Sequence, residues 1–244
     1  MFPLRDEIKS ESTPWLTWLL IALNSAVFFY ELSLGEALNN LVMNYGLVPW
    51  KMTRGISENG FSVQDNVVPW VTSMFLHGGW LHFLGNMWFL YIFGDNVEDR
   101  LGRGRYLALY LSGGLLAALT QVVASPASPV PMVGASGAIA AVMGAYLVLY
   151  PRARVFSVIP IFILLYFVRI PAFIFIGIWF GLQFLQGYAS LLAGNESAGV
   201  AWWAHIGGLL GGVLLACILR SGTRPRGRRD FRRGSVNVVR GPWK

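Results

Sequence analysis

Charged residues are scarce in this chain of 244 residues. They make up 13% of it, whereas hydrophobic residues make up 55%. Soluble globular domains carry about 25% charged residues. A shortage this large, together with several long apolar runs, excludes an ordinary soluble domain and predicts an integral membrane protein that crosses the bilayer several times.

Cysteine is almost absent as well. The single cysteine, Cys217, excludes an internal disulfide and any cysteine-rich metal cluster. We therefore expect neither a metal ion nor a cofactor.

The apolar runs predict the membrane spans, but the fifth run is compatible with either one span or two. The runs are Trp15–Leu34, Trp80–Phe93, Tyr106–Val123, Ala138–Tyr150, Val155–Ala193 and Val200–Leu219. One span needs about 20 residues, so the fifth run is about twice as long as a span. It forms either a hairpin of two spans, or one span preceded by a segment at the membrane surface.

The distribution of basic residues decides between these possibilities, because basic loops stay on the cytoplasmic side. Basic residues occur in the loops GDNVEDRLGRGR and YPRAR and nine times from Arg220 to Lys244, but not in ASPASPVPMVG or AGNESAG. Only a single fifth span puts all basic segments on one side. Since proline disfavours helix at the preceding residue, we expect Val155–Val168 at the cytoplasmic interface and the fifth span at Pro171–Leu192.

These inferences define the predicted architecture, which is an all-α, polytopic membrane protein with a bundle of six transmembrane helices. Residues 1–14 are expected to be a flexible cytoplasmic segment, residues 15–219 the membrane domain, and residues 220–244 a basic, disordered cytoplasmic tail. Residues 36–70 form a long first external loop. A basic tail binds either nucleic acid or anionic lipid, and beside a membrane domain we expect anionic lipid and no nucleic acid.

A single serine stands out in the stretch PMVGASGAIAAVMGAYLVLY, where Ser136 follows GA and precedes Gly137 at the start of an uncharged helix. The helix from Gly137 to Tyr150 is about 21 Å long, whereas the hydrocarbon core is about 30 Å thick. If the arginines after Tyr150 hold its end at the cytoplasmic surface, Ser136 lies about 9 Å below the external surface.

A single histidine reaches a similar depth from the same side. His205 is about five residues into the sixth helix, which is about 7 Å along its axis. A histidine within a span usually faces the protein interior or a water-filled cavity. It is either a base for Ser136 or a neutral structural histidine hydrogen-bonded to a neighbouring helix.

Small residues repeat every four positions on both helices. The two stripes are Ser136, Ala140 and Gly144, and Ala204, Gly208 and Gly212. Such stripes let transmembrane helices pack closely. The pattern indicates helix packing, and close packing is also what a short Ser–His hydrogen bond requires.

Two further polar residues lie near the outer end of the second span, in WLHFLGNMWFL. His82 and Asn86 are four residues apart and share one helix face, so both can donate to an oxyanion. Free backbone N–H groups begin the fourth helix, and Gly137 there allows close approach of a substrate backbone. His77 is interpreted as an interfacial or turn residue. Because no Asp or Glu lies at this depth, we expect a Ser–His dyad and not a triad.

The motifs GASG, with Ser136, AHIGGLLGG, with His205, and HFLGN, with His82 and Asn86, together resemble the rhomboid family of intramembrane serine proteases. The resemblance extends from about Trp15 to Arg220. It implies a six-helix bundle, a Ser136–His205 dyad, an oxyanion site of His82, Asn86 and backbone N–H groups, and a first external loop embedded in the outer leaflet. One departure is Trp70-Val71, where many members have a Trp-Arg pair.

The resemblance also implies a function. We expect a serine endopeptidase that cleaves single-span membrane proteins near the outer face of a bacterial cytoplasmic membrane, with both of its own termini in the cytoplasm. The alternative is a non-catalytic relative that binds client transmembrane helices, although such a relative is expected to have lost the serine or the histidine. A transporter is less favoured because no charged pathway and no inverted repeat is recognisable.

Overall fold

Six long helices dominate the computed structural model, which describes residues 1–162, 164–192 and 201–221. They are α1 (Trp15–Ser33), α7 (Trp80–Leu101), α8 (Arg103–Ala124), α9 (Ser136–Leu149), α10 (Ala172–Leu192) and α11 (Trp202–Leu219). By length and composition α1, α8, α10 and α11 are able to cross a membrane, and α9 is a shorter apolar helix of 14 residues. The basic tail from residue 222 onward lies outside the described residues, so the prediction for it is not addressed.

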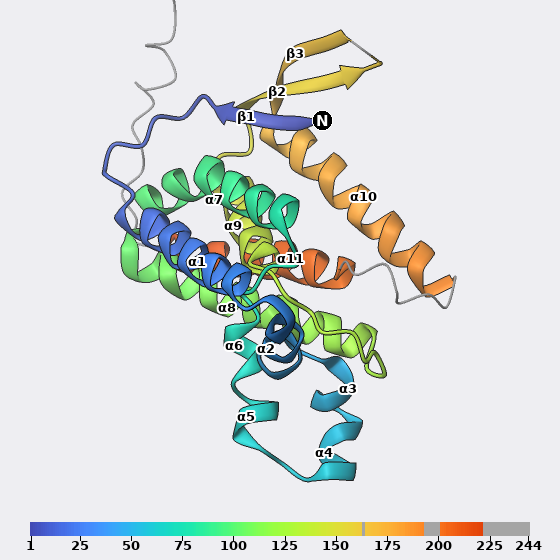
Figure 1. Cartoon of the computed structure of the whole chain (residues 1–244). Helices are drawn as coiled ribbons and strands as arrows, with labels where there is room; N and C mark the ends of the chain where they lie inside the picture. Colours follow the sequence, from blue (N-terminus) through green and yellow to red (C-terminus); the bar gives the residue numbers. More distant parts are fainter. Residues whose placement is uncertain (163, 193–200, 222–244) are drawn as a thin grey trace, which may run out of the picture.

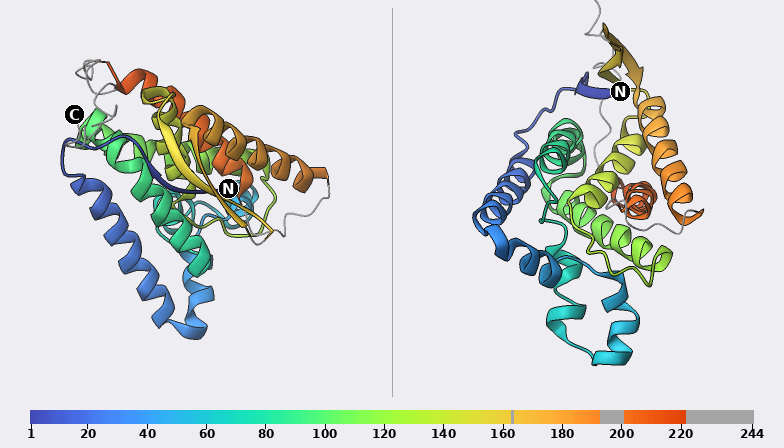
Figure 2. Two further views of the ribbon diagram at one scale, coloured as in Figure 1. Left: turned by 90° about the horizontal axis from the view of Figure 1, so that it is seen from above. Right: turned by 45° about the vertical axis from the view of Figure 1, so that its right-hand side comes forward.

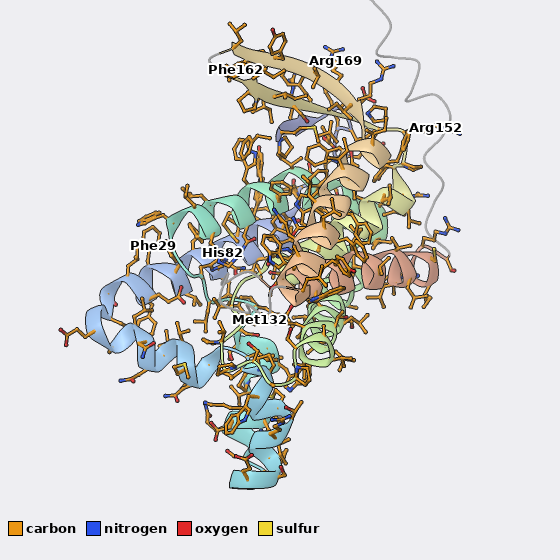
Figure 3. All side chains as sticks on the ribbon, turned by 90° about the vertical axis from the view of Figure 1, so that its right-hand side faces the viewer. Phe29, His82, Met132, Arg152, Phe162 and Arg169 are labelled. Carbon is orange, nitrogen blue, oxygen red and sulfur yellow. The ribbon has the colours of Figure 1, made fainter. Side chains whose placement is uncertain are left out.

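The helices form one bundle with α11 inside it. Figure 2 shows α11 end-on between α8, α9 and α10, and the contacts of α11 are with these same three helices. The helices α7, α9 and α11 begin at one end of the bundle, here called the site end. The helices α7 and α9 finish at the opposite end, here called the far end, where α1, α8 and α10 begin. In Figure 3, His82 at the start of α7 and Arg152 just after α9 lie on opposite sides of the molecule.

The fifth apolar run forms one helix and not two, as predicted, because α10 covers only Ala172–Leu192. The residues before it form a β-hairpin, with strands β2 (Arg154–Ile161) and β3 (Leu164–Pro171). Strand β1 (Phe2–Asp6) pairs antiparallel with β2, which completes a three-stranded sheet at the top of Figure 1. Phe162, with φ of 53°, turns the hairpin and is fully exposed at its tip (Figure 3).

The sheet makes two predictions wrong. The chain is mostly helical but not all-α, and part of the N-terminal segment expected to be flexible is a paired strand. The residues of β2 and β3 are rich in β-branched and aromatic side chains, which favour strands. An apolar run of eight residues has the same periodicity in a buried strand as in a helix, so the pattern alone does not separate them.

The far end is held together by buried polar groups, and α7 extends further there than predicted. It continues through the charged residues after Phe93 and ends only at Gly102, whose φ is 79°. The carboxylate of Glu98 accepts hydrogen bonds from the N–H groups of Leu16 and Thr17, at 3.0 and 2.8 Å, at the start of α1. The first N–H groups of a helix need such acceptors. The charged end of α7 is therefore useful as a helix, because it presents Glu98 to the start of α1.

Asp6 of β1 is the second polar group at the far end. Its Oδ2 accepts hydrogen bonds from Asn96 Nδ2 of α7 at 2.8 Å and from the Tyr146 hydroxyl of α9 at 2.6 Å. Burial raises the pKa of Asp6 to about 7, and the nearby Asp95 adds to the rise, although the bond from Tyr146 opposes it. The Asp6 carboxyl therefore fixes the N-terminal strand to the bundle, and the Trp88 indole N–H, which donates to the Pro3 carbonyl at 2.7 Å, adds a second attachment.

An apolar layer separates this far-end cluster from the site end. The layer consists of five fully buried side chains from α7, α9 and α10, namely Leu90, Phe93, Met143, Phe175 and Ile176. The Phe93 ring meets the Tyr146 ring edge-on with centroids 5.0 Å apart, and the centroid of Phe175 is 6.1 Å from that of Phe93. These five side chains therefore place apolar atoms between α7, α9 and α10 at this level of the bundle.

The segment between α1 and α7 is folded into short helices instead of an open loop. These are the 3-10 helix η1 (Gly35–Ala37) and α2 (Leu38–Tyr45), α3 (Pro49–Met52), α4 (Arg54–Asn59), α5 (Val63–Asn66) and α6 (Pro69–Thr72). Leu47 and Met132 exchange backbone hydrogen bonds of 3.0 and 2.8 Å, which tie the segment to the stretch before Ser136. Trp70 packs with Leu47 against α8 and its indole N–H donates to the Asn66 carbonyl at 2.9 Å, while Val71 is exposed. Trp70 therefore anchors the segment without an arginine beside it.

Candidate active site

Ser136 is the first residue of α9, and the chain reaches it through a constrained turn. Gly134 has a φ of +126°, a conformation that residues with a side chain rarely adopt. A Cβ atom at this position would lie 2.6 Å from His82 Nε2, and the Gly134 N–H donates to the Ser73 carbonyl at 2.8 Å. Glycine is therefore required here both by the backbone and by the close approach of His82.

His205 lies in the first turn of α11 and faces Ser136. Its Nε2 atom is 2.8 Å from the Ser136 hydroxyl oxygen, although the two residues are 69 positions apart in the sequence. Gln121 of α8 supports this turn, because its side-chain oxygen accepts a hydrogen bond from the Ala204 N–H at 3.3 Å. The structure brings together the two residues that sequence reasoning singled out.

Close contact between α9 and α11 makes this approach possible. A Cβ atom on Gly144 would overlap the Leu209 carbonyl, and Cβ atoms on Gly208 and Gly212 would overlap carbonyls of α9. Ala140 lies beside Gly208 in the same contact. The predicted small-residue stripes thus lie in the α9–α11 contact, where a larger side chain would push Ser136 and His205 apart.

The His205 ring is surrounded by α10 and by the start of α11. Its centroid is 5.6 Å from that of Trp179 and 6.3 Å from that of Trp202. Its second nitrogen, Nδ1, is 2.6 Å from the side-chain oxygen of Gln183, which is 8% exposed. Sequence reasoning missed Gln183. The signal available was its spacing of four residues from Trp179, which puts both on one face of α10.

His82 and Asn86 supply hydrogen-bond donors beside this pair. His82 Nδ1 accepts from the Gly78 N–H at 3.3 Å, so the neutral ring carries its proton on Nε2. The Asn86 amide nitrogen is buried and has no hydrogen-bond partner among the described residues. Both side chains line the same cavity as Ser136 and His205.

The cavity has a volume of about 710 Å³, and its lining includes residues at the site end. Phe89 and Met143 line it towards the apolar layer. Gly137 does not line it, because the side of Gly137 that lacks a Cβ atom faces Ala117 of α8, where an added Cβ would be 2.6 Å from Ala117 Cβ. The open side of Gly137 therefore allows helix packing, and the expectation that Gly137 makes room for a substrate stays a prediction.

No carboxylate among the described residues lines the cavity. Glu31 of α1 is buried nearby, where both of its oxygens accept from the His77 N–H at 3.1 Å. His77 lies in the turn before α7, as predicted, but it is 3% exposed and not at a surface. Burial, with a contribution from His82, lowers the pKa of His77 to about 4. The described residues also contain no group of three potential metal-binding side chains.

Comparison with known proteins agrees with this arrangement. A family model described as Rhomboid domain matches residues 64–222, which contain Ser136, His205, His82 and Asn86. The chain belongs to the rhomboid family. With its apolar helices, this membership makes it an integral membrane protein.

Named relatives include rhomboid proteases. The chain is 30% identical over 207 residues to Rhomboid protease GluP of Bacillus subtilis, which covers 84% of this chain and 35% of that protein. It is 32% identical over 167 residues to Presenilin-associated rhomboid-like protein A, mitochondrial, of Danio rerio. This match covers 59% of this chain and 43% of that protein. This rhomboid chain thus spans less than half the length of the curated relatives it matches.

Proposed function

We propose that this rhomboid-family chain is an intramembrane serine endopeptidase in which Ser136 is the nucleophile and His205 is the general base, without a cofactor. The observation that carries the proposal is the 2.8 Å contact between His205 Nε2 and Ser136 Oγ at the wall of the cavity. A nucleophile and a base within hydrogen-bond reach are the signature of covalent catalysis.

The reaction proceeds in two halves. The Ser136 oxygen attacks the carbonyl carbon of the scissile peptide bond while His205 Nε2 takes the hydroxyl proton. His205 then gives this proton to the departing amine, which leaves the acyl group esterified to Ser136. Water attacks the ester with His205 again as the base, and the second product leaves with a free carboxylate.

The negative charge that develops on the carbonyl oxygen is stabilised by fixed donors. His82 and Asn86 both line the cavity, and each has a side-chain N–H to donate, which supports their assignment as oxyanion donors. The backbone N–H groups of Ser136 and Gly137 are free at the start of α9 and add to them. When the substrate binds, its oxyanion supplies these donors with a hydrogen-bond acceptor.

The substrates are single-span membrane proteins whose transmembrane helix is destabilised near the outer face. A transmembrane helix of this kind is able to reach a site beneath the membrane surface. The length of α9 supports the depth of Ser136, because α9 has 14 residues whereas a full span needs about 20. The alternative, a non-catalytic protein that binds client helices, is less favoured because both Ser136 and His205 are present and hydrogen-bonded.

The orientation follows from charge. We propose six spans in a bacterial cytoplasmic membrane, with both termini in the cytoplasm and the site end facing outward. Arg152 and Arg154 follow α9, and Arg100 and Arg103 flank the junction of α7 and α8, all at the far end. Basic residues accumulate on the cytoplasmic side, and the basic tail then lies beside anionic lipid.

The experiment reconstitutes the protein in liposomes with a model single-span substrate. Wild type should cleave it, and Ser136→Ala and His205→Ala should both be inactive while the control Ser25→Ala, remote on α1, retains full activity. Cleavage by Ser136→Ala would refute the proposed nucleophile. Binding of substrate by the wild type without cleavage would favour the non-catalytic alternative.

A further inference from the structure

Gln183 is a buried polar residue to which the mechanism so far assigns no task. It lies on α10 one turn after Trp179, and both side chains face His205. At 2.6 Å from Nδ1, the Gln183 oxygen makes the shorter of the two contacts of the His205 ring nitrogens.

The chemistry of this contact restricts the position of the proton. A carboxamide oxygen only accepts hydrogen bonds, so the nitrogen that faces it must carry hydrogen. In a neutral imidazole only one nitrogen is protonated, and the hydrogen bond at one nitrogen therefore determines the state of the other. With the proton on Nδ1, the Nε2 atom is free to accept the hydroxyl proton of Ser136.

We propose that Gln183 is a positioning residue that holds His205 in the tautomer with hydrogen on Nδ1. This inference rests on the proposed function, because the tautomer matters only if His205 acts as a base. Gln183 takes the orienting task that a carboxylate has in a serine protease triad, but it brings no charge into the membrane. A charged carboxylate at such a depth would be costly.

A purely structural role would have different consequences. Trp179 already covers the His205 ring, so loss of Gln183 could leave the ring in place and still change its tautomer. The test must therefore measure the position of the proton. Gln183→Met removes the acceptor at similar length, and Gln183→Glu keeps an acceptor oxygen. Gln186→Met is the matched control, because Gln186 is exposed three residues further along α10.

The first measurement is the ¹⁵N NMR spectrum of the protein with labelled histidine, with His205 assigned by its loss in His205→Ala. We expect the wild type to show a protonated Nδ1 and an unprotonated Nε2 at His205. Gln183→Met should lose this signature, whereas Gln183→Glu and Gln186→Met should keep it. A wild-type His205 with hydrogen on Nε2 would overturn the proposal without any variant being needed.

The second measurement is the rate at which a fluorophosphonate probe labels Ser136. Loss of the correct tautomer costs up to about 10⁴-fold in serine proteases that have a triad. We expect Gln183→Met to slow labelling at saturating probe by at least about tenfold, with little change in the probe concentration for half-saturation, and Gln183→Glu to restore part of the rate. An unchanged labelling rate in folded Gln183→Met overturns the proposal for Gln183. A wild type that the probe labels no better than Ser136→Ala refutes instead the protease function, and the NMR result for the tautomer is not affected.

Discussion

At the scale of single residues, the site holds a donor that has nothing to bind. The Asn86 amide nitrogen is buried and unpaired among the described residues. A buried polar group left unpaired costs about 1–3 kcal/mol. Such a cost is tolerated when a ligand or a transition state completes the hydrogen bond, and this argues that the amide serves the developing oxyanion.

Asn86→Ala should therefore lower the turnover number more than the affinity for substrate. Loss of one oxyanion donor typically reduces the rate by about 10²–10³, which corresponds to about 3–4 kcal/mol. Activity should not vanish, since His82 and backbone N–H groups remain. Steady-state cleavage of a single-span substrate gives kcat and KM separately. A fully active variant would reduce Asn86 to a helix-packing amide.

The sequence identified some site residues and not others for a physical reason. Ser136, His205, His82 and Asn86 are conspicuous because they are isolated polar residues in apolar runs, where a polar side chain is costly. Gln183 is uncharged, and a second glutamine follows three residues later. The sequence therefore offers two glutamines that could contact His205. Only the rotation of α10 in the bundle decides which of them faces His205, and that rotation depends on packing between helices.

At the scale of elements, the distance between Ser136 and His205 depends on how closely α9 and α11 pack. The two helices touch backbone to backbone because glycine lies at each close approach. Helix α9 occupies Ser136–Leu149, one residue from its predicted range, because an uncharged helix between a glycine turn and arginines is well delimited. The hairpin before α10 was not predicted, since its apolar residues fit a helix and a strand equally well.

Gly144→Ala should damage both stability and activity. Its new Cβ would meet the Leu209 carbonyl of α11, and overpacking of this kind costs about 1–3 kcal/mol. We expect a lower unfolding midpoint in detergent and slower probe labelling of Ser136. Gly181→Ala on α10 is the control, because a Cβ there meets nothing within 4 Å. Equal behaviour of the two variants would mean that the helix contact does not limit the site.

The N-terminal strand gives a pH-dependent prediction. The folded state raises the pKa of Asp6 from 3.8 to about 7, so folding binds a proton between these values and Asp6 makes the protein less stable as pH rises through them. His77 acts in the opposite direction, since its pKa is lowered from 6.5 to about 4 and its contribution to stability rises with pH. The wild-type profile alone therefore conceals both contributions.

Comparison of the wild type with Asp6→Asn separates them. Asparagine still accepts the hydrogen bonds from Tyr146 and Asn96 but does not ionise. The variant should match the wild type near pH 4 and exceed its free energy of unfolding increasingly towards pH 8, by up to about 4 kcal/mol. Chemical unfolding in detergent at a series of pH values measures the difference. A difference that stays constant with pH would show that Asp6 does not titrate in this range.

At the scale of the whole molecule, the helices alternate in direction so that Ser136 and His205 meet at one end. A single helix in the fifth apolar run is necessary for this, because a second one would reverse α11. The bias of basic residues predicted that count correctly. It also predicts which end faces the cytoplasm, and this part stays a prediction.

A cysteine at Ser235 in a Cys217→Ala background tests the orientation. If the tail is cytoplasmic, a membrane-impermeant maleimide should label this cysteine only after the cells are permeabilised. A cysteine at Glu36, between α1 and α2, should be labelled on intact cells and serves as the control for the outer face. Labelling at position 235 on intact cells would put the site at the inner face and contradict the proposed cleavage near the outer one.

The apolar layer of Leu90, Phe93, Met143, Phe175 and Ile176 has a consequence for the cell's energy supply. The proposed hydrolysis requires water deep in the membrane, and water next to ionisable side chains conducts protons. Beyond this layer lie Asp6, Asn96 and Tyr146, a second set of groups able to relay a proton. Because five apolar side chains lie between the two sets, we expect water that enters the cavity from the site end not to reach Asp6 by this route. A protein of the proposed function could then hydrolyse peptide bonds inside the membrane without opening a proton path to the other face.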